Sequence, residues 1–396
     1  MKILLLTQVL PYPPDSGPKV KTWNVLKYIA KNHDVTLVSF IRGDQSQDIN
    51  QLKDFCSGGV YTVPMVRSLR TEIFALFQSL RSRNPWLIER DGRKEMQRLV
   101  DRLASHYSFD IIHVDQLNMA QYAIRVQDSK RVLDAHNALW LLYQRLWKTM
   151  KPGPKKWLLN RDWRLMKRYE GIMCRLFEAV ITVSNEDKQA MEETVNETLN
   201  IEVIPIAVDT EEVQPIIRDS PNRHIVHIGT MYWPPNIDGV RWFINEVFPI
   251  IRETRSDVVF DIIGSRPPQD LERLNNKGHG VNVTGYIEDP SVYLERAAVM
   301  VVPLRAGGGM RVKILNALSQ GLPIVTTKIG CEGIAVKSGN HLLVADSSCD
   351  FAQATLSLLN DQVMAKELGN NGRRLVEEQY DYRIACRPLD RIYTEI

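Results

Sequence analysis

Residues 299–318 read VMVVPLRAGGGMRVKILNAL. The β-branched and apolar run Val299–Val302 ends at Pro303 and predicts a buried strand. Three successive glycines follow, and Ile314, Leu315 and Leu318 then recur at helical spacing. A strand, a glycine loop and a helix in this order are typical of a parallel α/β sheet, in which ligands bind at the carboxyl ends of the strands.

The same alternation of short apolar runs and helical stretches continues along the whole chain. It predicts an α/β protein with two Rossmann-like, doubly wound parallel-sheet domains that meet near Pro205. The predicted strands are Ile3–Leu6, Val35–Val38, Ile111–Val114, Arg131–Leu133, Val180–Val183 and Val203–Ile204 in the first half, and Ile225–Ile228, Val258–Ile263, Val281–Val283, Val299–Val302, Ile324–Thr326 and Leu342–Val344 in the second.

The composition excludes several classes of protein. Of 396 residues, 44% are hydrophobic and 24% are charged, which argues against disorder. The five cysteines are odd in number and form no C-x-x-C pair, which argues against a disulfide scaffold and a structural zinc site. The longest apolar run, Ala297–Leu304, is far shorter than the roughly 20 residues that span a bilayer. We therefore expect a cytoplasmic protein.

Charge divides unevenly between the two halves. Residues 1–200 carry 30 basic and 22 acidic side chains, whereas residues 201–396 carry 20 and 25, within a net charge of +3. This asymmetry predicts that the two domains have different partners.

The loop after Val302 has the features of a diphosphate site. The N-terminus of the following helix directs its positive dipole end at the loop, and backbone N–H groups at Gly308 and Gly309 can approach an anion. Arg311 and Lys313 add two cations. Being two residues apart, they reach one ligand only if Arg311 lies before the regular helix. The alternative is a surface loop with solvated charges.

Three further loops follow predicted strands. The first, Pro11–Pro18, contains Gly17 before a helix and lacks the dinucleotide fingerprint. The second, Thr327–Ile334, contains Glu332, whose carboxylate can accept hydrogen bonds from sugar hydroxyls. The third contains His136, a candidate base or acceptor contact that Asp134 would orient. The alternatives are a stiff strand–helix connection for the first loop, a solvated carboxylate for Glu332 and a histidine in a turn for His136.

These loops carry a family resemblance that covers nearly the whole chain. The chain resembles a retaining glycosyltransferase of family 4, which has the GT-B fold, and within it the bacterial enzymes that build exopolysaccharide. The segments that carry the resemblance are Pro11–Gly17, Asp134–Asn137, Val180–Ser184, Ile204–Asp209, Gly307–Ala317 and Gly321–Asp346.

The resemblance implies transfer of a sugar from a nucleotide-diphosphate sugar to a glycan or lipid-linked acceptor, with the anomeric configuration retained. Residues 1–205 would bind the acceptor and residues 206–380 the donor, with a cleft between them. The last segment, 381–396, would pack back on the first domain. Neither a cofactor nor a metal ion is implied, so protein cations would offset the charge of the leaving diphosphate.

The resemblance also assigns site residues. His136, Arg311 and Lys313 would be catalytic, with His136 contacting the donor sugar or an acceptor hydroxyl. Gly17 matches a glycine close to the phosphates, and Tyr286 and Ile287 match the segment along the base. The implied donor-binding residues are Gly17, Gly229, Thr230, Tyr286, Ile287, Gly308, Gly309, Asn316 and Glu332.

The sequence departs from the family at two points. Two glutamates that the family usually carries correspond to Gly308 and Asn316, and the usual Arg and Lys after the first donor-domain strand are replaced at Gly229 and Thr230. The segment that stands in place of that Arg and Lys is Gly229–Asn236. Arg311 and Lys313 could take over the role of those cations, and Glu332 could replace the lost sugar contact. A nucleotide-sugar epimerase or phosphorylase, and a non-catalytic nucleotide-sugar-binding protein, are the competing hypotheses.

Residues 143–175 are both basic and aromatic. Ten Lys and Arg side chains are interleaved with Tyr and Trp against only Asp162 and Glu170. Such a stretch can lie on an anionic membrane, which predicts peripheral binding at the inner face of the cell membrane. A solvated basic face with inward-packed tryptophans is the alternative. The modest overall charge and the lack of a recognised motif argue against nucleic-acid binding.

Overall fold

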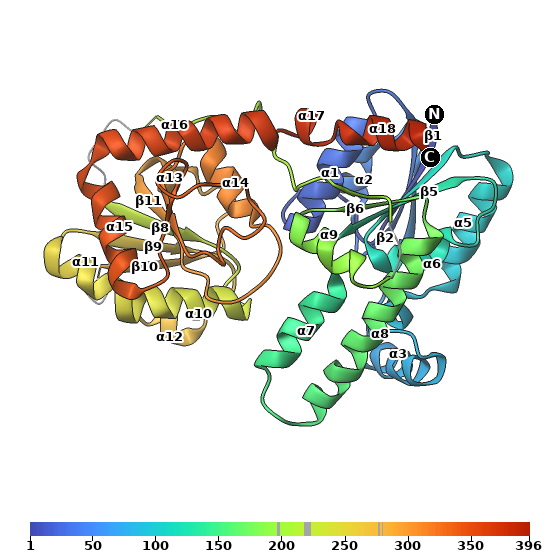
Figure 1. The fold of residues 1–396 in the computed structure, drawn as a ribbon, viewed down its shortest axis with the longest axis horizontal. Coiled ribbons are helices and arrows are strands. Elements are labelled where there is room, and N and C mark those ends of the chain that lie inside the picture. The colour runs from blue at the N-terminus through green and yellow to red at the C-terminus, as the bar shows by residue number, and fades with distance from the viewer. Residues whose placement is uncertain (196–198, 218–222, 276–277, 279) are drawn as a thin grey trace. The chain divides into compact units, whose positions relative to one another are not determined.

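The computed structural model describes residues 1–195, 199–217, 223–275, 278 and 280–396, and these form two compact units. Unit 1 comprises Met1–Ile206 and Ala385–Ile396, and unit 2 comprises Ala207–Ile384. Each unit contains its own parallel sheet with helices packed against it (Figure 1). The predicted pair of Rossmann-like parallel-sheet domains is confirmed.

The sheet of unit 1 has seven strands in the order β3-β2-β1-β4-β5-β6-β7, and all neighbours are parallel. All the carboxyl ends therefore lie at one edge, and the strand order reverses direction between β1 and β4. The strands are β1 (Lys2–Thr7), β2 (Asp34–Ile41), β3 (Val60–Pro64), β4 (Ile111–Asp115), β5 (Lys130–His136), β6 (Ala179–Thr182) and β7 (Ile201–Val203).

Both faces of this sheet are covered. Ile3 and Leu5 of β1 pack into one apolar core, whereas Leu4 and Leu6 pack into the other. Strands buried on both faces consist of continuous apolar runs, which is why they were recognisable in the sequence. The helices are α1 (Gly17–Ile29), α2 (Ser46–Lys53), α3 (Leu69–Ser82), α4 (Trp86–Asp91), α5 (Lys94–His106), α6 (Ala120–Ala123), α7 (Leu139–Thr149), α8 (Pro154–Leu176), α9 (Asn185–Glu192) and α18 (Pro388–Glu395), with a 3₁₀ turn at Leu117–Met119.

Strand β3 was not predicted. It is one of the two edge strands of the sheet, and of its five residues only Val63 is buried. It ends at Pro64, a residue that sheets tolerate at edges because it cannot donate a ladder hydrogen bond. A short edge strand lacks the continuous apolar run by which the central strands were identified.

The sheet of unit 2 has six parallel strands in the order β10-β9-β8-β11-β12-β13. Phe243, Phe260 and Phe351 meet in its core, with ring centroids 4.6 and 5.8 Å from that of Phe243. The elements are β8 (His224–Ile228), β9 (Val259–Ile263), β10 (Val281–Gly285), β11 (Ala297–Val302), β12 (Ile324–Thr326), β13 (Leu343–Val344), α10 (Pro234–Trp242), a π-helix at Phe243–Val247, α11 (Phe248–Thr254), α12 (Gln269–Glu272), α13 (Ser291–Glu295), α14 (Val312–Ser319), α15 (Ser348–Asn360), α16 (Gln362–Gln379) and α17 (Tyr382–Ala385).

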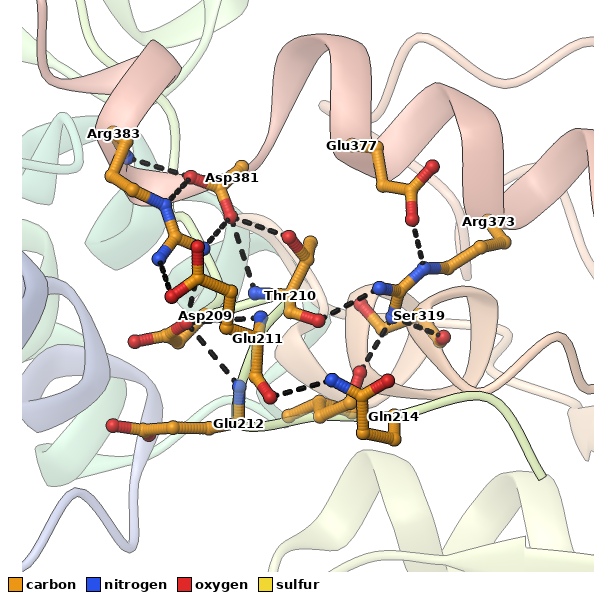
Figure 2. Close-up of polar contacts among 11 residues, drawn as sticks. Asp209, Thr210, Glu211, Glu212, Gln214, Ser319, Arg373, Glu377, Asp381 and Arg383 are labelled. Atoms are coloured by element: carbon orange, nitrogen blue, oxygen red, sulfur yellow. Dashed lines mark hydrogen bonds and ion pairs between the residues drawn. The ribbon is translucent and has the colours of Figure 1, made fainter.

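The segments by which the chain enters and leaves unit 2 are tied together. Arg373 of α16 donates to the carbonyl oxygens of Thr210 at 2.7 Å, Val213 at 2.5 Å and Ser319 at 2.7 Å (Figure 2). Since Thr210 and Val213 lie in the entering segment, this guanidinium fixes that segment to α16. Three good acceptors around one planar donor group make a geometrically defined anchor.

A second contact between the same two segments is centred on Asp381. The Asp381 carboxylate pairs with Arg383 at 2.6 Å and accepts from the hydroxyl of Thr210 at 2.6 Å (Figure 2). Burial raises the pKa of Asp381, but the hydrogen bonds from Arg383 and Thr210 outweigh burial and lower this pKa to about 2. The carboxylate therefore stays charged at neutral pH and holds both segments.

The end of the chain packs in unit 1. The hydroxyl of Tyr393 on α18 lies 2.6 Å from Nδ1 of His113 on β4, and Tyr28 of α1 donates to Asp390 at 2.7 Å. Both Tyr393 and His113 are buried. These contacts fix α18 against α1 and the central strand β4.

Candidate active site

The glycine loop of unit 2 connects β11 to α14 and is shaped by Arg311. Gly307 and Gly309 have φ values of +132° and +78°, a region that other residues rarely adopt. Arg311 immediately precedes α14 and has extended rather than helical backbone angles. Its Nη1 donates to the carbonyl oxygens of Gly308 and, at 2.6 Å, of Gly309. The guanidinium thus folds the loop around itself, before the first helical turn.

The side chain of Lys313 contacts a residue of the segment that follows β8, at the same edge of the sheet. Its Nζ donates to Oδ1 of Asn236 at 3.2 Å, and Nδ2 of Asn236 donates to the carbonyl of Thr230 at 2.9 Å. A Cβ atom at Gly229 would lie 2.7 Å from Nζ of Lys313 and 2.9 Å from Nδ2 of Asn236. Glycine at position 229 is what gives Lys313 and Asn236 their room.

The electrostatics around Lys313 favour an incoming anion. Burial, and then the nearby Arg311 guanidinium, lower the pKa of Lys313 from 10.5 to about 7. In the described part of the chain no carboxylate pairs with Lys313. A negatively charged ligand would relieve both the desolvation and the repulsion from Arg311.

His227 of β8 lies near Lys313. Burial, and then Lys313, lower the pKa of His227 to about 3, so its ring is neutral. Nδ1 donates to the carbonyl of Val301 at 2.9 Å, and Nε2 is buried with no hydrogen-bond partner among the described residues. The neutral imidazole adds no further positive charge to those of Lys313 and Arg311.

The other predicted donor-binding residues follow strands of the same sheet. Gly229 and Thr230 follow β8, and Glu332 lies in the segment after β12. Asn316 lies on the exposed side of α14. Tyr286 and Ile287 follow β10, two strands away from β8, and the Tyr286 side chain is 75% exposed. In the structure, Gly229 lies beside Lys313. Gly308 and Gly309 accept hydrogen bonds from Arg311. Tyr286 takes part in neither set of contacts.

In unit 1, the predicted His136 is the last residue of β5 and has a left-handed φ of +61°. Its Nε2 donates to Oδ1 of Asp115, the last residue of β4, at 2.8 Å. The same Oδ1 accepts from the hydroxyl of Thr22 at 2.8 Å. All three side chains are buried. Because Nε2 donates to Asp115, Nδ1 is the ring nitrogen that remains for a contact with another group.

The prediction that Asp134 orients His136 is wrong. Oδ1 of Asp134 lies 4.0 Å from Nε2 of His136, and instead pairs with Nζ of Lys21 at 3.0 Å. The strand register shifts between Asp134 and His136, and the positive φ at His136 turns its ring toward β4. Asp115, the neighbour of Asp134 across the ladder, therefore becomes the partner.

Helix α1 brings its first turns to the same edge. Gly17 is its first residue, and four and five residues later Lys21 and Thr22 reach Asp134 and Asp115. Lys21 also donates to the carbonyl of Ile204 at 2.8 Å. The histidine, its carboxylate and the first turns of α1 thus form one polar cluster at the carboxyl ends of β4 and β5.

Neither unit shows a metal centre in its described residues. No three His, Cys, Asp or Glu side chains there are grouped to hold a metal ion. Of the helices that the structure describes, none is long and apolar enough to cross a membrane.

Comparison with known proteins identifies the class. Residues 17–212 match the family described as Glycosyltransferase Family 4, and residues 222–361 match that described as Glycosyl transferases group 1. The chain is a glycosyltransferase of the GT-B type, with the group 1 match in unit 2 and nearly all of the family 4 match in unit 1.

Individual relatives are distant but match over the full length. The chain is 19% identical over 389 residues to an uncharacterized 44.6 kDa protein in the cps region of Klebsiella pneumoniae, covering 96% of each chain. It resembles Anabaena Alr3699/HepE, solved with UDP, with a TM-score of 0.68, 14% identity and all of each chain covered. It also resembles sucrose-phosphate synthase from Thermosynechococcus elongatus, with a TM-score of 0.72, 14% identity, and 100% and 99% coverage.

Asn236 was not predicted as a site residue. We expect Asn236→Ala to weaken binding of a nucleoside diphosphate about tenfold, because Lys313 loses the acceptor that fixes its ammonium. Asn236→Asp should weaken binding further, since a carboxylate at this distance would offset the positive charge that Lys313 offers to the diphosphate. Isothermal titration calorimetry measures both, with the exposed Asn370→Ala on α16 as the matched control. An Asn236→Asp protein that binds like the wild type would contradict this role.

Proposed function

We propose that this protein is a retaining, metal-independent hexosyltransferase. It transfers a sugar from a nucleotide-diphosphate sugar to a glycan or lipid-linked acceptor, in exopolysaccharide or cell-surface polysaccharide synthesis. The observation that carries the proposal is Lys313, a lysine with a pKa of about 7 that no described carboxylate neutralises, at the ligand-binding edge of the unit 2 sheet. Two relatives support the donor class and the pathway: Alr3699/HepE is solved with UDP-glucose, and the Klebsiella relative lies in a cps region.

In the proposed reaction, unit 2 binds the donor. Lys313 and Arg311, with the N–H groups of Gly308 and Gly309, stabilise the charge that develops on the diphosphate as the bond between the anomeric carbon and the phosphate oxygen breaks. The acceptor hydroxyl attacks the same face of the sugar, and the departing phosphate oxygen takes its proton. Bond making and proton transfer therefore balance without a protein nucleophile.

Unit 1 binds the acceptor in this proposal. His136, oriented by Asp115, contacts the donor sugar or the attacking hydroxyl through Nδ1. Gly17 lets the first turn of α1 come close to the phosphates. Asn316 and Glu332 contact hydroxyl groups of the donor, Gly229 and Thr230 line the phosphates, and Tyr286 and Ile287 lie along the base.

A lipid-linked acceptor would place the enzyme at the inner face of the cell membrane. The basic stretch 143–175 forms most of the helical hairpin α7–α8 (Figure 1). Three of its aromatic rings lie against cations of the hairpin itself: Lys156 lies over Trp147, Arg164 over Trp163 and Lys167 over Trp140. The hairpin therefore offers positive charge more than apolar surface, which suits attraction to anionic lipid.

A non-catalytic sugar-nucleotide-binding protein is the second candidate. It is favoured by Gly308 and Asn316, which stand where the family usually has glutamates. Such a protein would bind the nucleotide and not turn over. An epimerase would convert its donor without any acceptor.

Calorimetric titration with UDP, GDP and ADP, without added metal, tests the proposal. We expect one diphosphate to bind the wild type, and the Arg311→Ala/Lys313→Ala protein to lose that binding. The corresponding sugar nucleotide is then offered with a membrane extract as acceptor, and the anomeric configuration of the product is read by NMR. Binding without transfer or donor conversion would favour the non-catalytic candidate, and no binding of any diphosphate would refute the donor site.

A further inference from the structure

Helix α3 exposes its large apolar side chains. Leu69 is 77% exposed, Phe77 is 62% exposed and Leu80 is 49% exposed, with Ile73 and Phe74 between these values. Leu69, Ile73, Phe77 and Leu80 stand at positions i, i+4, i+8 and i+11, which form one stripe along a helix. A contiguous exposed apolar patch of this kind marks an interaction site on a soluble domain.

The inward face of α3 is made of small residues. Its two buried residues are Ala75 and Ser79. Arg161 of α8 donates to Oγ of Ser79 at 3.1 Å and to its carbonyl at 2.5 Å, and Nε1 of Trp86 donates to the carbonyl of Glu72 at 3.4 Å. These polar contacts fix the helix with its apolar stripe outward, so the orientation is built into unit 1.

Positive charge accompanies the stripe. Arg70 and Arg81 lie near the two ends of α3 and Arg83 follows it, and all three are exposed. Glu72 is the one acidic residue in the sequence of the helix. An apolar stripe flanked by arginines has the composition of a helix that lies in the headgroup region of an anionic bilayer.

We propose that α3 inserts its apolar stripe into the surface of an anionic membrane. A second copy of this chain fits less well, because pairing two such faces would bring the arginines of both copies together. A bilayer rich in anionic lipid supplies both hydrocarbon for Ile73 and Phe77 and negative charge for Arg70 and Arg81. This inference does not depend on glycosyl transfer, and it adds an apolar element to the basic hairpin.

The hairpin extends the same surface. Helix α8 lies beside α3, joined to it through Arg161 and Ser79 (Figure 1). Trp157 precedes Arg161 by four residues, so it shares the face of α8 that meets α3, and its side chain is 64% exposed. Tryptophan is favoured at the boundary between lipid and water, where one end of its ring system is apolar and the other is polar.

Vesicle flotation at low salt tests the proposal. The purified full chain is mixed, without any donor, with vesicles of phosphatidylglycerol and phosphatidylethanolamine, or of phosphatidylcholine alone. We expect flotation with the anionic vesicles, and Ile73→Gln/Phe77→Gln to lower the partition coefficient about tenfold or more, because both side chains lose apolar contact with lipid. Arg70→Gln/Arg81→Gln should reduce the preference for anionic over neutral vesicles.

Val292→Gln/Val363→Gln is the matched control, since both valines are exposed helical residues of unit 2. It should float like the wild type. Thermal denaturation and diphosphate titration show that each variant remains folded, and they separate failure of this inference from failure of the donor site. Flotation of Ile73→Gln/Phe77→Gln at the wild-type level would overturn the proposal. So would a wild-type dimer in sedimentation that these substitutions dissociate, with no vesicle binding by either protein.

Discussion

Lys313→Met is expected to lower affinity for the nucleoside diphosphate about a hundredfold and to leave affinity for the nucleoside unchanged. The ammonium of Lys313 lies beside Asn236, and a charge-assisted hydrogen bond from it to phosphate is stronger than a neutral one. The base and ribose make no contact with this ammonium in the proposed mode of binding. Calorimetry with the diphosphate and its nucleoside separates the two effects.

The same lysine should make binding depend on pH. With a pKa of about 7, Lys313 is charged below pH 7 and increasingly neutral above it. A bound diphosphate favours the charged form, so binding takes up a proton at higher pH. Between pH 7 and 9, where the diphosphate itself is ionised, affinity should therefore fall by up to about tenfold per pH unit. Lys313→Met should lose this dependence.

Stability provides the control for folding. Because the pKa of Lys313 is lower in the folded protein than its ordinary 10.5, the unfolded chain binds more protons between these values, and the charge opposes folding at neutral pH. Lys313→Met should then melt no earlier than the wild type at pH 7. Lys366→Met, at an exposed position of α16, should change neither binding nor melting. Equal losses of nucleoside and diphosphate affinity, or an early melting transition, would contradict the assignment.

The central strands could be predicted because burial on both faces imposes a continuous apolar run. Ile3–Leu6 and Val299–Val302 both lie within observed strands, β1 and β11. The edge strand β3 escaped prediction because only Val63 needs to be apolar. The glycine loop with Arg311 and Lys313 could also be predicted, since its glycines and its two basic residues lie within seven consecutive residues.

Contacts between segments that are distant in the sequence could not be predicted. Asn236 meets Lys313 across 77 residues, and Asp115 meets His136 across 21, because strand order and register bring their loops together. A polar residue at the carboxyl end of a central strand, as Asp115 is, would have been the signal for the second contact. The apolar stripe of α3 has the spacing of a buried face, so its exposure follows only from the contacts of Ser79 and Trp86.

His136→Ala is expected to lower kcat about a hundredfold or more, with diphosphate affinity near the wild-type value. His136 belongs to unit 1. In the proposed function it contacts the sugar or the acceptor hydroxyl, whereas Lys313 and Arg311 bind the diphosphate. A positioned imidazole typically contributes a factor of this size to the rate. Steady-state transfer kinetics and calorimetry measure the two quantities independently.

Asp115→Asn tests whether the carboxylate acts through the histidine. An amide can still accept from Thr22, but it no longer holds the Nε2–H form of His136 by charge, so Nδ1 is less reliably an acceptor. We expect kcat to fall about tenfold and its pH profile to shift, and no further loss when Asp115→Asn is added to His136→Ala. His106→Ala, an exposed histidine of α5, should be silent. If the two substitutions are instead additive, Asp115 supports the fold of unit 1 rather than the orientation of His136.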